Sequence, residues 1–264
     1  MCEIFVFAKR LIGKLIGLFG LVAIKKKTLD SFSPRIPLTQ GLIFLLSLQS
    51  THVKDIYPIL SKCRSQNYQD LFVLSEFGLK KQGFFVEFGA SNGLDFSNSF
   101  LLENDFGWSG ILVEPARIWH EALRRNRPKA IIEESCVWRI SDSLMIFNQT
   151  IDGNLSTLDA FSSSDSHREL RQSGNKYEVR TISLTDLLDK YSAPKTIDYL
   201  SIDTEGSEFE ILNAFDFDRY SFSMITCEHN YTPARDKIHK LLTSKGYVRK
   251  YEELSLWDDW YVKV

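Results

Sequence analysis

Short apolar runs alternate with amphipathic segments from residue 84 to residue 264. Five of the runs predict buried strands, at residues 84–88, 110–114, 130–138, 197–203 and 221–228. Helical patterns lie at 117–126, 185–191, 207–215 and 234–246, and extended segments at 177–184, 247–253 and 256–264. Strands separated by helices are typical of βαβ units, so the pattern predicts an α/β fold with a mainly parallel sheet and helices on both faces. The short connection between the last two extended segments predicts an antiparallel edge strand.

Residues 139–176 interrupt this alternation and are rich in Ser, Asp and Asn. We interpret them as an insertion at the rim of the site. Trp138, Trp257 and Trp260 could join the insertion in a surface of rings and hydrogen-bonding groups that suits a carbohydrate. The alternative interpretation is that these three rings pack in the core.

The first 30 residues carry six basic and two acidic side chains around the apolar run LIGKLIGLFGLVAI. This run holds a lysine and is too short for a transmembrane helix. A helix here would place its apolar side chains on one stripe, namely Leu11, Leu15, Leu18 and Val22. Such a helix predicts a peripheral contact with an anionic membrane surface through residues 1–30. The alternative is a helix that packs on the main domain or forms an oligomer contact.

Two prolines make residues 28–40 a predicted linker, and the apolar run at 41–48 is short enough to be a core helix. The chain therefore divides into an N-terminal helical and apolar extension, residues 1–60, and a main domain, residues 61–264.

Composition narrows the class of protein. The chain has 264 residues, of which 44% are hydrophobic and 25% charged, and this excludes intrinsic disorder. A net charge of −2 gives no basic field for nucleic acid, so we expect no nucleic-acid partner. The four cysteines form no C-x-x-C pair, which argues against a zinc site or a disulfide framework. Reduced thiols predict a cytoplasmic protein, with membrane association as an addition through residues 1–30.

Candidate chemistry begins in the loop after the first strand, EFGASNG, residues 87–93. Ligands of doubly wound sheets bind at the carboxyl ends of the strands, and Gly89 and Gly93 let the backbone approach a ligand. The carboxylate of Glu87 would repel a pyrophosphate but suits a cation. Glu114 ends the second strand, where an acid is placed to hold ribose hydroxyls. The pattern predicts a positively charged adenosine ligand without phosphates, such as S-adenosylmethionine. The alternatives are a strand-end ion pair for Glu87 and a solvated strand end for Glu114.

The segment DTEGSE, residues 203–208, places three carboxylates after another buried strand. Such a group predicts an ammonium or sulfonium ligand, a metal site or a general base. We expect Asp203 and Glu205 to face the site. Glu208 is better explained as a helix-start residue that interacts with the helix dipole.

The next strand ends in Glu228-His229-Asn230, on the same side of the predicted sheet. His229 would titrate near neutral pH, which makes it a candidate base, and the alternative is a hydrogen-bonded structural histidine. Carboxylates and a histidine at neighbouring strand ends also allow a divalent metal, which we do not favour; Asp203 and Glu228 would be its ligands.

Several motifs occur in an order that resembles one known family. They are SQNYQD (65–70), FFVEFGASNG (84–93), SNS with LE (97–99 and 102–103), GWSGILVEP (107–115), LSIDTEGSEFEIL (200–212), ITCEHN (225–230) and DDWYV (258–262). Residues 60–264 thus resemble the FkbM-type methyltransferases, a branch of the class I S-adenosylmethionine-dependent methyltransferases. The resemblance implies a Rossmann-like, seven-stranded sheet with the last strand antiparallel. It also implies O-methylation of a hydroxyl on a sugar, a glycan or a secondary metabolite.

The resemblance assigns roles to the candidate residues. Cofactor contacts are implied for Glu87, Gly89, Ala90, Asn92, Gly93, Ser97, Asn98, Glu114 and Asp203. The methyl-bearing end would lie near Asp203 and Glu205, with Asp203 or His229 as the base. Ser91 stands where the wider class has a third glycine. Two other classes are weighed against this one: a non-catalytic FkbM-like interaction module, and an NAD-dependent oxidoreductase, which the acid Glu87 disfavours because it would repel cofactor phosphates.

Overall fold

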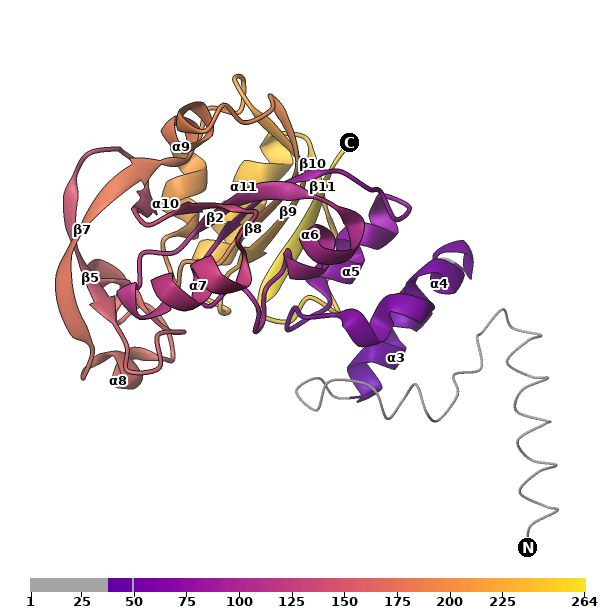
Figure 1. The fold of residues 1–264 in the computed structure, drawn as a ribbon, viewed down its shortest axis with the longest axis horizontal. Coiled ribbons are helices and arrows are strands. Elements are labelled where there is room, and N and C mark those ends of the chain that lie inside the picture. Colours follow the sequence, from indigo (N-terminus) through magenta and orange to yellow (C-terminus); the bar gives the residue numbers. More distant parts are fainter. Residues whose placement is uncertain (1–37, 49) are drawn as a thin grey trace, which may run out of the picture.

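The computed structural model describes residues 38–48 and 50–264 (Figure 1). The interpretation of residues 1–30 as a helical segment lies outside these residues, as does that of 28–37 as part of the predicted linker. The last three residues of the predicted linker 28–40 are helical instead, because α3 begins at Leu38. The α-helices are α3 (Leu38–Ser47), α4 (Ser50–Ile56), α5 (Gln69–Glu76), α6 (Phe100–Phe106), α7 (His120–Asn126), α8 (Arg168–Arg171), α9 (Leu184–Lys190), α10 (Glu208–Asn213) and α11 (Ala234–Ser244). In the described part of the chain, no helix has the length and apolarity needed to cross a membrane.

The strands are β1 (Phe84–Phe88), β2 (Ser109–Val113), β3 (Ile131–Glu133), β4 (Cys136–Trp138), β5 (Leu144–Gln149), β6 (Thr157–Leu158), β7 (Asn175–Ser183), β8 (Thr196–Ile202), β9 (Ser221–Glu228), β10 (Tyr247–Lys250) and β11 (Asp258–Lys263). Short 3-10 helices occupy Tyr57–Lys62, Arg117–Trp119 and Asp159–Phe161. The predicted α/β alternation is confirmed.

The main sheet has seven strands in the order β10-β11-β9-β8-β1-β2-β3. All neighbours are parallel except β11, which is antiparallel to both β9 and β10. The last two strands form an antiparallel pair at this edge of the sheet, as predicted; β10 is the outer strand of the pair, and β11 lies between β10 and β9. The residues explain this order: Asp258, Asp259, Trp260 and Tyr261 of β11 are all buried, whereas β10 keeps Arg249 and Lys250 partly exposed.

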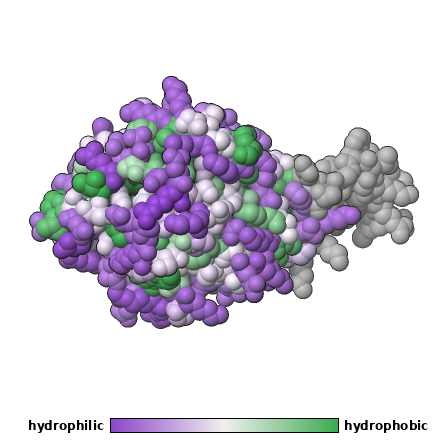
Figure 2. Space-filling view, turned by 90° about the horizontal axis from the view of Figure 1, so that it is seen from above, coloured by the Kyte–Doolittle hydropathy of each residue, from purple (hydrophilic) through white to green (hydrophobic). Residues whose placement is uncertain are grey.

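Helices cover both faces of the main sheet. On one face, side chains of α3 to α7 pack with Phe85, Leu112 and Trp260. On the other face, α9, α10 and α11 pack with Leu200, Ile225 and their neighbours. Phe44, Leu45 and Leu48 are buried in the first of these clusters, so the predicted core helix at 41–48 is confirmed. The face seen in Figure 2 is mostly hydrophilic, as is usual for a protein surface.

The predicted strand at 130–138 is divided in two. β3 stays in the main sheet, and β4 leaves it to pair with β7. The insertion contributes β5 and β6, which form a second sheet with β4 and β7 in the order β4-β7-β5-β6. This sheet stands beside the carboxyl ends of the main strands (Figure 1). Trp138 is buried in the core of this second sheet and Trp260 in that of the main sheet. The core interpretation is thus confirmed for these two tryptophans.

Strand register brings the predicted acids to one edge of the sheet. Glu87 pairs with Ser201 of β8, and Phe88 pairs with Val113 of β2. Ile202 of β8 pairs with Cys227 of β9. The last residues of β1 and β9 therefore lie close to the residues that follow β2 and β8.

Candidate functional site

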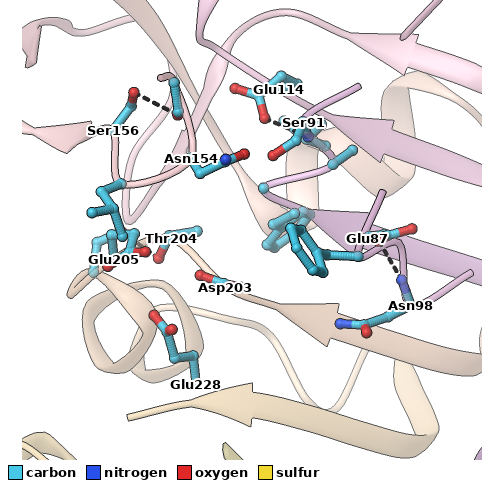
Figure 3. Close-up of a pocket in the computed structure, with 18 of the residues that line it drawn as sticks. Glu87, Ser91, Asn98, Glu114, Asn154, Ser156, Asp203, Thr204, Glu205 and Glu228 are labelled. Carbon is cyan, nitrogen blue, oxygen red and sulfur yellow. Dashed lines mark hydrogen bonds between the residues drawn. The ribbon is translucent and has the colours of Figure 1, made fainter. Parts of the chain in front are cut away.

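A cavity of about 460 Å³ opens at the carboxyl ends of the parallel strands (Figure 3). The ends of β1, β2, β4, β8 and β9 and the turns after them form one part of its wall. The insertion contributes Phe147, residues 153–156, Leu158, Ser166 and His167. The expectation that the insertion borders the site is confirmed. Trp257 lines the cavity, unlike Trp138 and Trp260.

Glu114 follows β2 and is buried in the cavity wall. Its Oε2 accepts a hydrogen bond from the amide of Ser91 at 2.7 Å, and its Oε1 accepts one from the amide of Ala116 at 2.7 Å. Burial raises the pKa of Glu114 to about 7; the two amide bonds oppose this rise and the carboxylate of Asp203 adds to it. Among the described residues each oxygen has this one hydrogen-bond partner, so a second lone pair on each is able to accept a hydroxyl donor from a ligand.

The turn after β1 requires glycine at position 89. Gly89 has a φ of +70°, and a Cβ built on it would lie 2.2 Å from the backbone oxygen of Asp203. The amides of Gly89 and Ala90 both donate to the oxygen of Val113, at 3.1 and 3.3 Å. Gly89 therefore lets the ends of β1 and β8 meet at the cavity, and Ala90 and Ser91 line it.

Glu87 is buried in the cavity wall and organises the segment before α6. Its Oε1 accepts the amide of Asn98 at 2.8 Å, and its Oε2 accepts the hydroxyls of Ser97, at 3.1 Å, and Ser99. Asn98 in turn donates from Nδ2 to Ser201 at 2.8 Å. The Oδ1 of Asn98 is buried and has no hydrogen-bond partner among the described residues. This oxygen is therefore available to a ligand donor.

Asn92 and Gly93 support the loop without lining the cavity, contrary to the prediction of cofactor contacts. Asn92 Oδ1 accepts the amides of Leu94 and Asp95, both at 2.9 Å, so it closes a local turn. A Cβ on Gly93 would lie 2.6 Å from Cγ of Arg127. The buried Arg127 guanidinium donates to the oxygen of Gly93 at 3.1 Å and to the Ser97 hydroxyl at 3.1 Å. Sequence analysis missed Arg127, which lies behind the wall as its support.

Three carboxylates meet at the ends of β8 and β9. Oxygens of Asp203, Glu208 and Glu228 all lie within 4.8 Å of one another. Burial raises the pKa of Asp203 to about 7; a hydrogen bond with Glu228 opposes this rise, and nearby carboxylates add to it. Burial and Asp203 also raise the pKa of Glu228. Glu208 accepts the amides of Thr204 and Gly206 at 2.8 and 3.1 Å, which agrees with its expected structural role.

Glu205 lines the cavity but is held in an ion pair. Its Oε2 lies 2.7 Å from Arg171 and accepts a hydrogen bond from Asn230 at 3.4 Å. Burial and the neighbouring Asp203 raise the pKa of Glu205, and the Arg171 guanidinium opposes this rise. Because its oxygen is already paired, Glu205 suits the wall of the site better than the role of a base.

His229 is not among the residues that line the cavity, so the geometry does not support its predicted role as the base. Its Nδ1 accepts the amide of Tyr231 at 3.0 Å, and its Nε2 faces Asp259 at 3.7 Å. Burial lowers the pKa of His229. The structural interpretation of this histidine is therefore the better one.

His167 also lines the cavity, although no role was predicted for it from the sequence. Its position in an insertion without periodicity gave no signal. Gln69 and Asp258 also line the cavity, and Gln69 donates from Nε2 to Asp258. Burial raises the pKa of Asp258 to about 8. Both residues stood within the quoted motifs SQNYQD and DDWYV, although no role was inferred for them.

The hydrogen-bond acceptors in the cavity wall fit the adenosine ligand that the sequence predicts. Glu114 offers free lone pairs beside the Gly89 turn, and Asn98 offers an unpaired oxygen. Figure 3 shows Glu114 and Ser91 on one side of the cavity and Glu228 on the other. The fit to a metal is weaker, because the Glu208 carboxylate already accepts two backbone amides.

Comparison with known families agrees with this geometry. The family model described as Methyltransferase FkbM domain matches residues 87–249. This span begins at Glu87 and contains Glu114, Asp203, Glu228 and the whole insertion. None of the curated proteins matches this chain significantly.

Similar solved structures include precorrin-6y C5,15-methyltransferase from Geobacter metallireducens GS-15, with 14% identity, a TM-score of 0.40, and coverage of 73% of this chain and 85% of that chain. The protein 1320 from Thermoplasma acidophilum has 11% identity and a TM-score of 0.37, over 92% and 98% of the two chains. A TehB-like SAM-dependent methyltransferase from Corynebacterium glutamicum has 7% identity and a TM-score of 0.37, over 81% and 97%.

Proposed function

Because this chain belongs to the FkbM methyltransferase family, we propose that it methylates a hydroxyl oxygen of a sugar, a glycan or a secondary metabolite. The fold is the Rossmann-like fold of class I methyltransferases, a class that uses S-adenosylmethionine. The observation that carries the proposal is the position of Glu114, a buried acid with free lone pairs beside the glycine turn, in a cavity that continues to Asp203.

The cofactor half of the cavity comprises Gly89, Ala90, Ser91, Asn98 and Glu114. Glu114 would accept the ribose hydroxyls, and the unpaired Oδ1 of Asn98 would accept a further donor. The surrounding carboxylates favour a cation over a phosphate-bearing cofactor. When bound, S-adenosylmethionine supplies an electrophilic methyl group attached to a sulfonium sulfur.

Asp203 is the group that best fits the base. It lies at the end of β8 on the cavity wall, and burial raises its pKa to about 7, which suits proton transfer near neutral pH. The hydroxyl of the acceptor would give its proton to the Asp203 carboxylate as its oxygen forms a bond to the methyl carbon. The carbon–sulfur bond would break at the same time, with its electron pair left on the sulfur of S-adenosylhomocysteine. Holding the acceptor in line with the methyl group contributes the rest of the rate enhancement.

The charge of the cavity wall limits which methyl acceptor can bind there. None of the described residues that line it is Lys or Arg, whereas seven are acidic: Glu87, Asp95, Glu114, Asp203, Glu205, Glu228 and Asp258. An acceptor with a phosphate or carboxylate at the reacting end would meet repulsion without a cationic partner. Carboxylate and amide groups instead accept hydroxyl donors, which favours a polyhydroxylated acceptor.

Turnover on defined acceptors tests this proposal. The protein is incubated with S-adenosylmethionine and a panel of methyl glycosides of neutral hexoses, 6-deoxyhexoses and uronic acids, and release of S-adenosylhomocysteine is measured. We expect turnover on neutral glycosides and none on uronides. Cofactor binding without turnover on any hydroxyl compound would favour the non-catalytic interaction module.

A further inference from the structure

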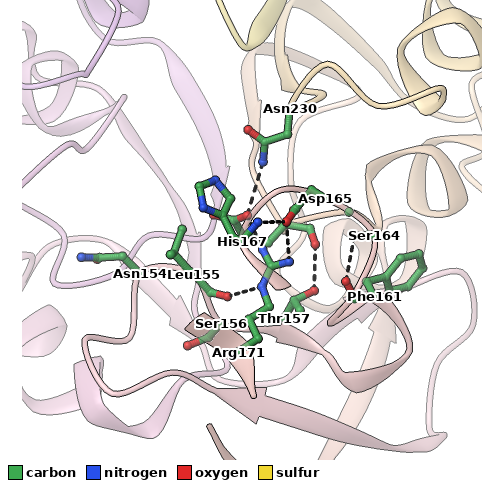
Figure 4. A network of polar contacts seen from close by, with 12 residues as sticks. Asn154, Leu155, Ser156, Thr157, Phe161, Ser164, Asp165, His167, Arg171 and Asn230 are labelled. Atoms are coloured by element: carbon green, nitrogen blue, oxygen red, sulfur yellow. Dashed lines mark hydrogen bonds and ion pairs between the residues drawn. The ribbon is translucent and has the colours of Figure 1, made fainter. Parts of the chain in front are cut away.

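The insertion holds the loop that follows β8 through contacts of several kinds (Figure 4). The hydroxyl of Thr157 donates to the backbone oxygens of Thr204 and Glu205, at 3.2 and 3.0 Å. Gly206 has a φ of +121°, and a Cβ there would lie 2.9 Å from Oγ of Ser164. The loop directly after Asp203 is thus held against the insertion at each of its three residues.

Arg171 connects the insertion to the loop that follows β8. Its guanidinium is fully buried and lies 2.7 Å from Glu205 and 2.9 Å from Asp165. Its Nε donates to the backbone oxygen of Leu155 at 2.8 Å. One side chain therefore fixes the turn at 153–156, the segment before α8 and the loop after β8.

Arg171 does not line the cavity, but the segments that it holds do. Asn154, Leu155 and Ser156 form the part of the wall that the insertion contributes, and Thr204 and Glu205 form the part that follows β8. Figure 4 shows Asn230 directed at this same network. Arg171 pairs with both Glu205 and Asp165, so its charge offsets only part of that of the two acids. Asn154, Ser156 and Thr204 add uncharged hydrogen-bonding groups to these walls, as a neutral polyol requires.

We propose that residues 154–156 and His167, with Thr204 and Glu205, form the acceptor subsite for an uncharged polyol, and that Arg171 is the positioning residue that sets the distance between its walls. This inference rests on the proposed function, since it assumes that the cofactor occupies the Glu114 half of the cavity. Asp203 precedes Thr204 directly, so a shift of the loop would also misplace the proposed base.

The test compares Arg171→Gln, Arg171→Lys and Thr157→Val with a matched control, Arg168→Gln. Arg168 lies on the same short helix but is exposed. Three properties are measured in the full chain: affinity for S-adenosylhomocysteine, hydrogen exchange of the segments 153–158 and 203–206, and saturation-transfer NMR signals of neutral methyl glycosides with S-adenosylhomocysteine at saturation.

We expect Arg171→Gln to speed exchange in both segments at least tenfold and to reduce the glycoside signal at least fivefold. Affinity for S-adenosylhomocysteine should stay within threefold of the unchanged protein. Arg171→Lys keeps the charge and should restore part of the glycoside signal, and Thr157→Val should speed exchange in 203–206. The control should behave as the unchanged protein.

Contrary results separate the two proposals. Failure of the unchanged protein to bind S-adenosylhomocysteine would refute the proposed function itself. Normal binding of that cofactor product with no glycoside signal would refute the acceptor subsite. If Arg171→Gln does not fold, the test rests on Arg171→Lys and Thr157→Val. The role of Arg171 would be overturned if both variants gave the same glycoside signal and the same exchange pattern as the control.

Discussion

The carboxylate of Glu114 accepts a hydrogen bond from the backbone amide of Ser91 at 2.7 Å, which ties the acid after β2 to the turn after β1. A second amide, that of Ala116, fixes the other oxygen. The acid is therefore held in place by the backbone before any ligand arrives. Preorganisation of this kind reduces the entropy that binding would otherwise cost.

Gly89→Ala should destabilise the protein more than Gly78→Ala. Both glycines have a positive φ, +70° and +56°, which strains an alanine by about 1–2 kcal/mol. Only at Gly89 would the new Cβ collide with a backbone oxygen, that of Asp203, whereas nothing lies within 4 Å at Gly78. Overpacking adds about 1–3 kcal/mol. Urea unfolding of the two variants measures the difference, and equal free energies of unfolding would contradict the close approach of β1 and β8.

Asp203→Asn should lower turnover by about 10²–10⁴-fold, the usual contribution of a general base. Affinity for S-adenosylmethionine should change by far less, because Glu114 and the Gly89 turn remain. Calorimetry and product release on the same preparation separate the two effects. An equal loss of turnover and of affinity would make Asp203 a binding residue and remove its role as the base. Asp218→Asn, at an exposed position, serves as the control.

Cofactor affinity should rise with pH between 6 and 8. The pKa of Glu114 is raised to about 7, so this acid is largely protonated at pH 6 and ionised at pH 8. Ribose hydroxyls favour the ionised form as a hydrogen-bond acceptor, so binding below pH 7 must displace a proton. One such group changes affinity by about tenfold per pH unit below its pKa. Titrations at pH 6, 7 and 8 in one buffer system check the sign; constant affinity would argue against ionisation of Glu114 on binding.

Removal of divalent metal should leave the protein unaffected. Glu208, the third member of the carboxylate group, already accepts the amides of Thr204 and Gly206. Burial and the Asp203 carboxylate raise the pKa of Glu228, so a proton on Glu228 relieves the repulsion between the two acids without a metal ion. Calorimetric titration of EDTA-treated protein with MgCl₂ or MnCl₂ should detect no stoichiometric binding. A clear one-to-one isotherm that disappears in Glu228→Gln would establish a metal site instead.

The acids at the strand ends could be predicted from the sequence because parallel strands bring their carboxyl ends to a single edge. Glu87, Glu114, Asp203, Glu205 and Glu228 all follow or end apolar runs, and all line the cavity. The sequence pattern was less informative where backbone direction decides which way a side chain points. His229 follows Glu228 directly, yet only Glu228 lines the cavity.

The features that could not be predicted from the sequence depend on contacts between segments that are far apart in the chain. Arg171 and Glu205 are 34 residues apart, and the insertion that contains Arg171 has no clear periodicity. Arg127 reaches the Gly93 loop from a helix 34 residues further along. The position of β11 likewise depends on which of two late strands buries more apolar surface, a comparison that alternation alone does not make.

Calorimetric titration with S-adenosylmethionine, S-adenosylhomocysteine and NAD tests the central claim most directly. Glu133→Ala serves as the matched control for Glu114→Ala, because Glu133 also is a buried acid at a strand end but does not line the cavity. We expect micromolar binding of the first two ligands and none of NAD. Affinity should fall by about 10- to 100-fold in Glu114→Ala, as expected for charged hydrogen bonds, and stay unchanged in Glu133→Ala. Binding of NAD, or equal affinities in the two variants, would contradict the account.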